Sequence, residues 1–144
     1  VSQKAKPHII IGDGLRKLER YGEAETAYRA ALEIDPENAS AHKKLSQSLL
    51  RLNRFDERVV EAKRAVECAP GNPTFLVFLG NALSQCNRAS EAEKAYRKAL
   101  QLDSDFARAK KALNKLAKQR EGLFRKRRSR LGAFFSRFTT DSGK

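Results

Sequence analysis

A segment of nine residues recurs along this chain at a fixed distance. The sequence AYRAALEID, which begins at Ala27, returns as AYRKALQLD at Ala95, 68 residues later, and a weaker copy, EAKRAVECA, begins midway at Glu61. The repeat period is therefore 34 residues. Because one unit of this length cannot bury its apolar side alone, the period predicts a stack of similar units that cover one another.

The alignment divides the chain into an N-terminal extension, 1–4, and three units, 5–38, 39–72 and 73–106. Small and apolar residues match between the units at spacings of three and four, which is typical of helices. The matching columns are Ile11/Leu45/Leu79, Gly12/Ser46/Gly80, Leu15/Leu49/Leu83, Ala24/Arg58/Ala92, Tyr28/Ala62/Tyr96, Ala31/Ala65/Ala99 and Pro36/Pro70/Ser104. Small residues let the second helix approach the first, and proline ends the second helix. Each unit is predicted to be an antiparallel helix pair.

The Gly/Leu, Ala/Tyr/Ala and Pro columns of residues 5–106 resemble those of the tetratricopeptide repeat family. The resemblance implies an all-α fold, an α-solenoid of three helix-turn-helix repeats in a right-handed superhelix. Arg58 and Ala62 depart from the family pattern and predict looser packing in the middle repeat. The sequence SEAE at Ser90 predicts a capping box at a helix start.

Two further helices are expected after the repeats. A capping helix is predicted over 107–120, with Ala109, Ala112, Leu113 and Leu116 on its packed face. A basic amphipathic helix with a frayed end is predicted over 121–144.

The resemblance also implies a binding surface, because the first helices of this family line a concave groove that holds an extended peptide or a partner helix. The corresponding positions here are Asp13, Arg16, Lys43, Lys44, Gln47, Arg51, Phe78, Asn81 and Lys111. This groove is predicted to suit a protein or peptide partner with acidic and apolar side chains. The alternative interpretation is that its lysines form an ordinary solvated helix face.

One subset of the family grips the C-terminal carboxylate of heat-shock chaperones with lysine, asparagine and arginine side chains. The five matching positions of this chain hold Ile9, Asp13, Lys44, Thr74 and Phe78. None of the five matches, so the resemblance favours an adaptor with a different ligand.

The net charge of +13 is concentrated in residues 107–144, which carry 13 basic and two acidic side chains. The segment GLFRKRRSRLGAFFSRF, from Gly122, also contains an apolar stripe at helical spacing. Covering four large apolar side chains contributes roughly 6–12 kcal/mol, whereas each basic residue near an anionic membrane contributes only about 1 kcal/mol. The stripe is therefore expected to dominate. The predicted interaction residues of this tail are Arg127, Arg128, Leu131, Phe134, Phe135 and Phe138.

Several surfaces could cover the stripe. It could fold back on the solenoid or pair with another copy as a homo-oligomer, lie in a membrane surface, or dock on a separate partner, and nucleic acid is the least favoured of these. The basic run RKRR also fits a nuclear import signal, which is a weak match.

The sequence contains no nucleophile elbow and no phosphate-binding loop. His8 and His42 share a repeat column and are interpreted as packing residues, and Cys68 and Cys86 form no metal-binding spacing. We therefore expect no enzyme activity, metal or cofactor. The absence of a long apolar run and of a leader pattern predicts a cytoplasmic protein.

The expected function is that of a noncatalytic scaffold or adaptor for protein interaction. The alternatives are a peripheral membrane or nucleic-acid adaptor acting through the tail, and the regulatory repeat segment of a larger protein.

Overall fold

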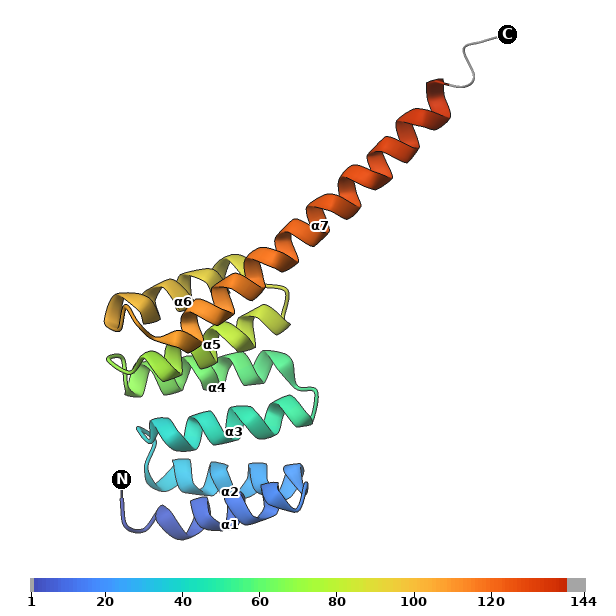
Figure 1. Cartoon of the computed structure of the whole chain (residues 1–144). Helices are drawn as coiled ribbons and strands as arrows, with labels where there is room; N and C mark the ends of the chain where they lie inside the picture. Colours follow the sequence, from blue (N-terminus) through green and yellow to red (C-terminus); the bar gives the residue numbers. More distant parts are fainter. Residues whose placement is uncertain (1, 140–144) are drawn as a thin grey trace.

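A computed structural model describes residues 2–139, which form seven α-helices and no strand. The helices are α1 (Lys6–Lys17), α2 (Tyr21–Ile34), α3 (Ala39–Arg51), α4 (Phe55–Cys68), α5 (Pro73–Gln85), α6 (Ala89–Leu102) and α7 (Ala107–Thr139). The first six stack as antiparallel pairs, one pair for each repeat, and α7 crosses the last pair and then runs outward (Figure 1). The predicted all-α solenoid is confirmed.

A close contact inside the first and third repeats explains why glycine is placed there. Gly12 of α1 faces the ring of Tyr28 on α2, and a Cβ atom at residue 12 would lie 2.5 Å from Cε1 of that ring. Gly80 and Tyr96 make the same contact between α5 and α6. The large ring therefore fills the space between the two helices only because the facing residue has no side chain.

The middle repeat changes both partners of this contact together. Ser46 replaces the glycine and Ala62 replaces the tyrosine, and Ser46 Oγ donates a hydrogen bond to the carbonyl of Arg58 at 2.9 Å. Arg58 itself is only 4% exposed. Its guanidinium lies over the ring of Phe78 in the third repeat, 5.6 Å from the centre of that ring, and the looser packing of the middle repeat stays a prediction.

The turn between the two helices of a repeat is built in the same way three times. Two residues after the end of the first helix, the backbone has a φ of 58–59°. The next amide donates back to a carbonyl five residues earlier, which is a Schellman closure. The residues with positive φ are Glu19, Asn53 and Asn87. Each precedes an arginine that forms an ion pair with a glutamate three residues further on, at Arg20–Glu23, Arg54–Glu57 and Arg88–Glu91.

The predicted capping box at Ser90 is wrong. Ser90 lies inside α6, whose N-cap residue is Arg88, and no side chain caps this helix end by hydrogen bonding to its backbone. The Arg88–Glu91 ion pair spans the first turn of the helix.

α7 is one helix of 33 residues, where the sequence predicts a capping helix to residue 120 and a separate helix after it. Its first turns pack on the third repeat through Ala109, Ala112, Leu113 and Leu116, as predicted. No proline occurs in α7, and an isolated glycine such as Gly122 weakens a helix without ending it.

The second half of α7 does not fold back on the solenoid, which excludes one of the predicted ways of covering its stripe. Every side chain from residue 117 to residue 138 is exposed. Arg120 forms an ion pair with Glu93 of α6 at 2.7 Å, and the C-terminal end of the helix projects away from the repeats (Figure 1). The predicted frayed end, residues 140–144, lies outside the described residues.

Candidate partner-binding site

Some of the predicted groove residues of the first two repeats bind one another. The carboxylate of Asp13 on α1 accepts a hydrogen bond from the Tyr28 hydroxyl at 2.7 Å and forms an ion pair with Lys44 of α3. Burial opposes ionisation of Asp13, but the hydrogen bonds from Lys44 and Tyr28 outweigh it and lower the pKa of this carboxyl. Burial and the bond to Asp13 raise the pKa of Tyr28 to about 12. The positive charge predicted at Lys44 is therefore neutralised within the chain.

The side chains at the other groove positions of α1 and α3 are more available to bind a partner. Lys43 and Gln47 are half-buried, and their side chains make no hydrogen bond within the part of the chain that the structure describes. The guanidinium of Arg51 lies over the ring of Tyr21, 5.7 Å from its centre. Arg16 has a buried Nε with no hydrogen-bond partner among residues 2–139.

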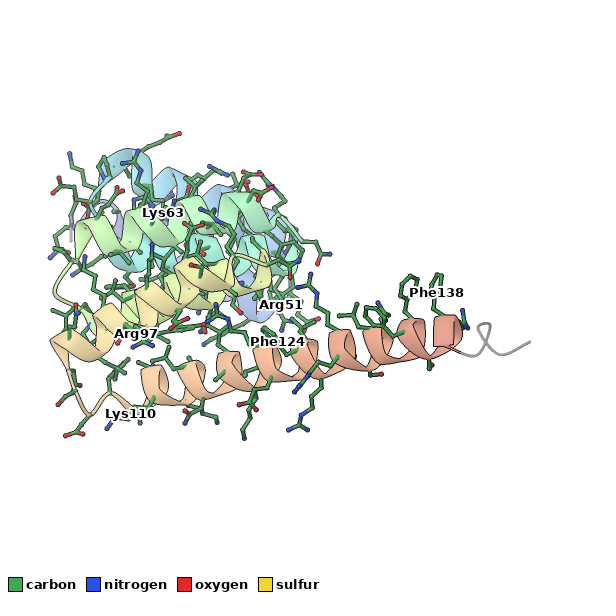
Figure 2. The ribbon with its side chains drawn as sticks, turned by 90° about the horizontal axis from the view of Figure 1, so that it is seen from above. Arg51, Lys63, Arg97, Lys110, Phe124 and Phe138 are labelled. Atoms are coloured by element: carbon green, nitrogen blue, oxygen red, sulfur yellow. The ribbon has the colours of Figure 1, made fainter. Side chains whose placement is uncertain are left out.

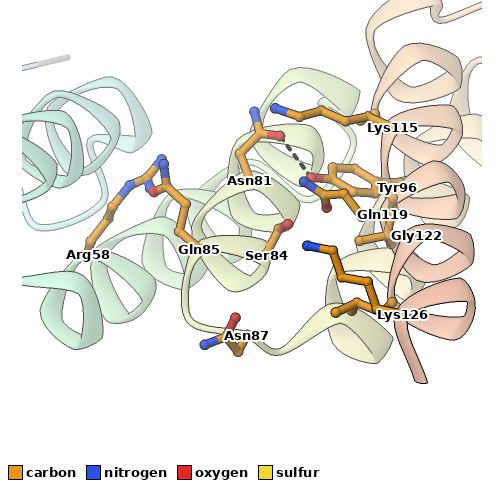
Figure 3. Close-up of a pocket in the computed structure, with 13 residues that line it drawn as sticks. Arg58, Asn81, Ser84, Gln85, Asn87, Tyr96, Lys115, Gln119, Gly122 and Lys126 are labelled. Atoms are coloured by element: carbon orange, nitrogen blue, oxygen red, sulfur yellow. Dashed lines mark hydrogen bonds between the residues drawn. The ribbon is translucent and has the colours of Figure 1, made fainter. Parts of the chain in front are cut away.

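In the third repeat, Asn81 lines a cavity of about 740 Å³ between α4, α5, α6 and α7 (Figure 3). The Tyr96 hydroxyl donates to Asn81 Oδ1 at 2.8 Å. Phe78 packs against the core, and the Arg58 guanidinium lies 5.6 Å from the centre of its ring. Lys111 lines a different hollow, formed by residues of α7 alone. The structure thus brings Asn81 into the cavity but not the other predicted groove residues.

Most polar side chains around this cavity were not among the residues predicted for the site. We call it the Arg58 pocket, and the polar side chains used below are Arg58, Asn81, Ser84, Gln85, Lys115 and Lys126. Arg58 stands out in the sequence because the other two repeats hold alanine in the same column. Lys126 gave no such signal, because its place beside the repeats depends on α7 continuing straight beyond residue 120.

His42 links α4 to the loop before α3. Its Nδ1 lies 2.7 Å from Glu61 Oε2 and its Nε2 lies 2.9 Å from the Pro36 carbonyl. A carboxylate and a carbonyl both accept hydrogen bonds, so this arrangement favours the ring with protons on both nitrogens. Burial lowers the pKa of His42, but the bonds to Glu61 and Pro36 outweigh it and the pKa is raised. His42 was interpreted from the sequence as a packing residue, and its ring also makes polar contacts. No metal-binding group of three His, Cys, Asp or Glu side chains occurs in residues 2–139.

The predicted tail residues form an exposed apolar face on α7 with basic residues around it. Leu123 and Phe124 extend the predicted stripe toward the repeats, and the distal apolar face, as we name it, consists of Leu123, Phe124, Leu131, Phe134, Phe135 and Phe138. Phe134 contacts the rings of Phe135 and Phe138, with centroids 6.0 and 5.0 Å apart. Arg127 lies within this face and Arg128 at its edge.

The distal apolar face continues the side of α7 that packs on the repeats. At 100° per residue, the stripe of Ala109 and Leu116 leads directly into that of Phe124 and Phe138. Phe124 and Phe138 accordingly point to the side of α7 on which the solenoid lies (Figure 2). Six basic residues and no acidic residue occur between Gly122 and Thr139. Across residues 2–139, no helix combines the length and apolar character needed to cross a bilayer.

Comparisons with known proteins agree with this architecture. A family model described as "Tetratricopeptide repeat" matches residues 11–73, and a second model of the same description matches residues 73–106. No curated protein sequence matches the chain.

Three solved structures illustrate the likeness of fold. The first TPR of Spaghetti (RPAP3), bound to the HSP90 peptide SRMEEVD, is 24% identical with a TM-score of 0.75, over 83% of this chain and 94% of that one. The Arabidopsis OM64 TPR domain is 23% identical with a TM-score of 0.72, over 80% and 95%. The Sgt2 TPR domain from Aspergillus fumigatus is 18% identical with a TM-score of 0.77, over 86% and 83%. The repeat columns, the helix pairs and the two family matches together show that this chain belongs to the tetratricopeptide repeat family.

Proposed function

We propose that the chain is a noncatalytic, cytoplasmic adaptor that binds a segment of a partner protein along α1, α3 and α5. The observation that carries this proposal is the arrangement of Lys43, Gln47 and Arg51 on α3. They form a polar, partly cationic row with no acidic residue among them, in front of a buried apolar core. Such a row suits a segment with acidic side chains. The similar structure bound to an acidic peptide supports this assignment by analogy of fold.

The positions of the chaperone-tail clamp argue for a different ligand here. Lys44 stands where that clamp has an asparagine, and its charge is satisfied by Asp13. Phe78 stands in place of an arginine and packs against the core. The proposed partner is therefore a protein segment held by Lys43, Arg51 and the third repeat, and not a chaperone tail.

Charge reversal on α3 tests this proposal. The variant Lys43→Glu/Arg51→Glu leaves the Asp13–Lys44 ion pair intact, and we expect it to lose capture of partners from cell extract while its helical circular dichroism is unchanged. The matched control is Lys63→Glu/Arg64→Glu on the exposed face of α4, which is expected to retain capture. Equal capture by both variants would be inconsistent with binding along α3.

Photocrosslinking tests the location of the partner independently of charge. A photoreactive amino acid at position 47 on α3 is expected to crosslink the captured partner, whereas one at position 63 on α4 is expected not to. Crosslinks only from position 63 would assign the partner to the opposite surface.

The distal apolar face supports a second proposed contact, with a partner protein or with another copy of the chain. Its phenylalanines are exposed on a helix that projects from the repeats, and its flanking arginines add positive charge. The rival function, a membrane-surface or nucleic-acid adaptor, also acts through this segment. Sedimentation of the full chain and of a chain ending at Gln119 with anionic liposomes and with oligonucleotides separates the two, because the rival requires salt-sensitive binding by the longer chain alone.

A further inference from the structure

Arg58 is the most unusual buried group of the molecule. The same column of the first and third repeats holds Ala24 and Ala92, both fully buried. Arg58 is 4% exposed, so an ionisable side chain occupies a position that otherwise contains a methyl group. Ala62, one turn further along α4, lacks the ring that Tyr28 and Tyr96 carry in its column, which leaves room on the same side of the helix.

The guanidinium of Arg58 has no anionic partner in residues 2–139. Its Nε and Nη1 atoms are buried without a hydrogen bond, and its one ring contact is with Phe78. Burial accordingly lowers the pKa of Arg58. A buried guanidinium without a counterion is strongly destabilising, because its charge is removed from water and nothing replaces the lost hydration.

The Arg58 pocket offers space for the missing anion. Arg58 projects from α4 on one side of the cavity, and Lys115 and Lys126 extend from α7 on the other (Figure 3). Asn81, Ser84 and Gln85 of α5 supply uncharged polar groups between them. None of the residues that line the cavity is acidic. Cations that converge on a concave surface without counter-charges raise the local concentration of anions.

We propose that the Arg58 pocket binds carboxylate side chains of an acidic peptide segment, with Arg58 as the buried anchor and Lys115 and Lys126 as flanking cations. Nη2 of the guanidinium, which unlike Nε and Nη1 is not sealed from solvent, can donate a charge-assisted hydrogen bond to one carboxylate, and the lysines can reach a neighbouring one. The segment therefore carries at least two nearby acidic residues. This inference deepens the proposed function, on which it rests, by naming the chemistry of the ligand at the third repeat and α7.

Two substitutions at position 58 separate binding from folding. Arg58→Met keeps the apolar length of the side chain and removes the charge, and Arg58→Ala restores the residue found at positions 24 and 92. Because both remove an uncompensated buried charge, we expect both variants to unfold at a urea concentration equal to or above that of the unmodified chain. Lys63→Met, on the exposed face of α4, is the matched control for loss of one positive charge.

The probe is a capped tripeptide of three glutamates, compared at constant ionic strength with its counterpart of three glutamines. We expect calorimetry to show binding of the glutamate peptide by the full chain, at least tenfold weaker binding by Arg58→Met and unchanged binding by Lys63→Met. The glutamine peptide is expected not to bind. Equal affinity for Arg58→Met and the unmodified chain, or no binding by the unmodified chain, would overturn the proposal.

The pocket and the groove can fail separately. Arg58-dependent binding of the tripeptide, together with unchanged partner capture by the Lys43/Arg51 variant, would support the pocket and refute the groove along α3. Loss of capture in that variant, together with tripeptide affinity that does not depend on Arg58, would support the groove and refute the pocket.

Discussion

Single residues set the spacing of the helices in each repeat, and Gly12 is the clearest case. A methyl group at this position would overlap the ring of Tyr28, which is itself fully buried and hydrogen-bonded to Asp13. The ring cannot move away without breaking that hydrogen bond or opening the core. Steric conflict of this kind is an overpacking effect.

We therefore expect Gly12→Ala to lower the free energy of unfolding by about 1–3 kcal/mol. Gly14, in the same helix, is the matched control, because a Cβ there would meet no atom within 4 Å. Gly14→Ala is expected to raise the free energy of unfolding by roughly 0.5–1 kcal/mol, since alanine loses less conformational freedom in a helix. Urea unfolding followed by circular dichroism measures both, and equal effects of the two variants would contradict the steric explanation.

His42 makes stability depend on pH. Its pKa is raised in the folded chain above the ordinary value of 6.5, because hydrogen bonds to Glu61 and Pro36 favour the charged ring more than burial and nearby Arg64 oppose it. A raised pKa means that the folded state holds this proton more tightly than the unfolded state. The resulting stabilisation is fully present below pH 6.5 and is lost as the pH rises through the folded pKa.

We expect the difference in unfolding free energy between the unmodified chain and His42→Gln to shrink as the pH rises above 6.5. The measurement is a series of urea titrations from mildly acidic to mildly alkaline pH. His8→Gln, in the same repeat column, is the control and is expected to retain the pH dependence. A difference that grows with pH would show that the sign assigned to this group is wrong.

Among the helices, α7 has two halves that differ in the burial of their apolar residues. Leu116 is 5% exposed and belongs to the core of the third repeat, whereas Leu131, on the same side of the helix, is 55% exposed. The amino acid and the secondary structure are identical at the two positions. Only the presence of a neighbouring helix distinguishes them.

Leu116→Ala is accordingly expected to lower the free energy of unfolding by roughly 2–5 kcal/mol, the usual range for a buried leucine. Leu131→Ala is expected to change it by no more than about 0.5 kcal/mol. Thermal unfolding at low protein concentration measures both, so that association between copies does not contribute. A large loss from Leu131→Ala under these conditions would mean that the second half of α7 packs on the repeats.

The helix pairs could be predicted from sequence because three copies of each column report the same local environment. The glycine, tyrosine and proline columns determine which faces meet and where the second helices end. The ends of α7 and the Arg58 pocket had no such repetition to support them. The change in composition at Gly122 favoured a boundary, but one glycine is insufficient to end a helix that is otherwise rich in good helix formers. The pocket depends on side chains from four helices, and its α7 residues lie outside the repeat pattern.

At the scale of the whole molecule, the net charge and the exposed apolar surface lie at the same end. Residues 107–144 carry 13 of the 30 basic side chains, and the distal apolar face lies on the part of α7 that leaves the repeats. The first half of this stripe is already covered by the third repeat. A helix pair from another molecule could continue the same packing along the second half, as successive repeats do in a solenoid.

We therefore expect the full chain to associate with itself over a dilution series in light scattering, and we expect Leu131→Glu/Phe134→Glu to remain monomeric. The driving force is burial of apolar side chains, each contributing roughly 1.5–3 kcal/mol when fully covered. Association through this face should persist or strengthen at high salt, which screens repulsion between the arginines. The control is Arg128→Gln/Arg130→Gln, which lowers the charge and keeps every phenylalanine, and it is expected to associate at least as well. A monomeric full chain at every concentration, or association that disappears at high salt, would contradict apolar pairing and favour a contact made by the arginines.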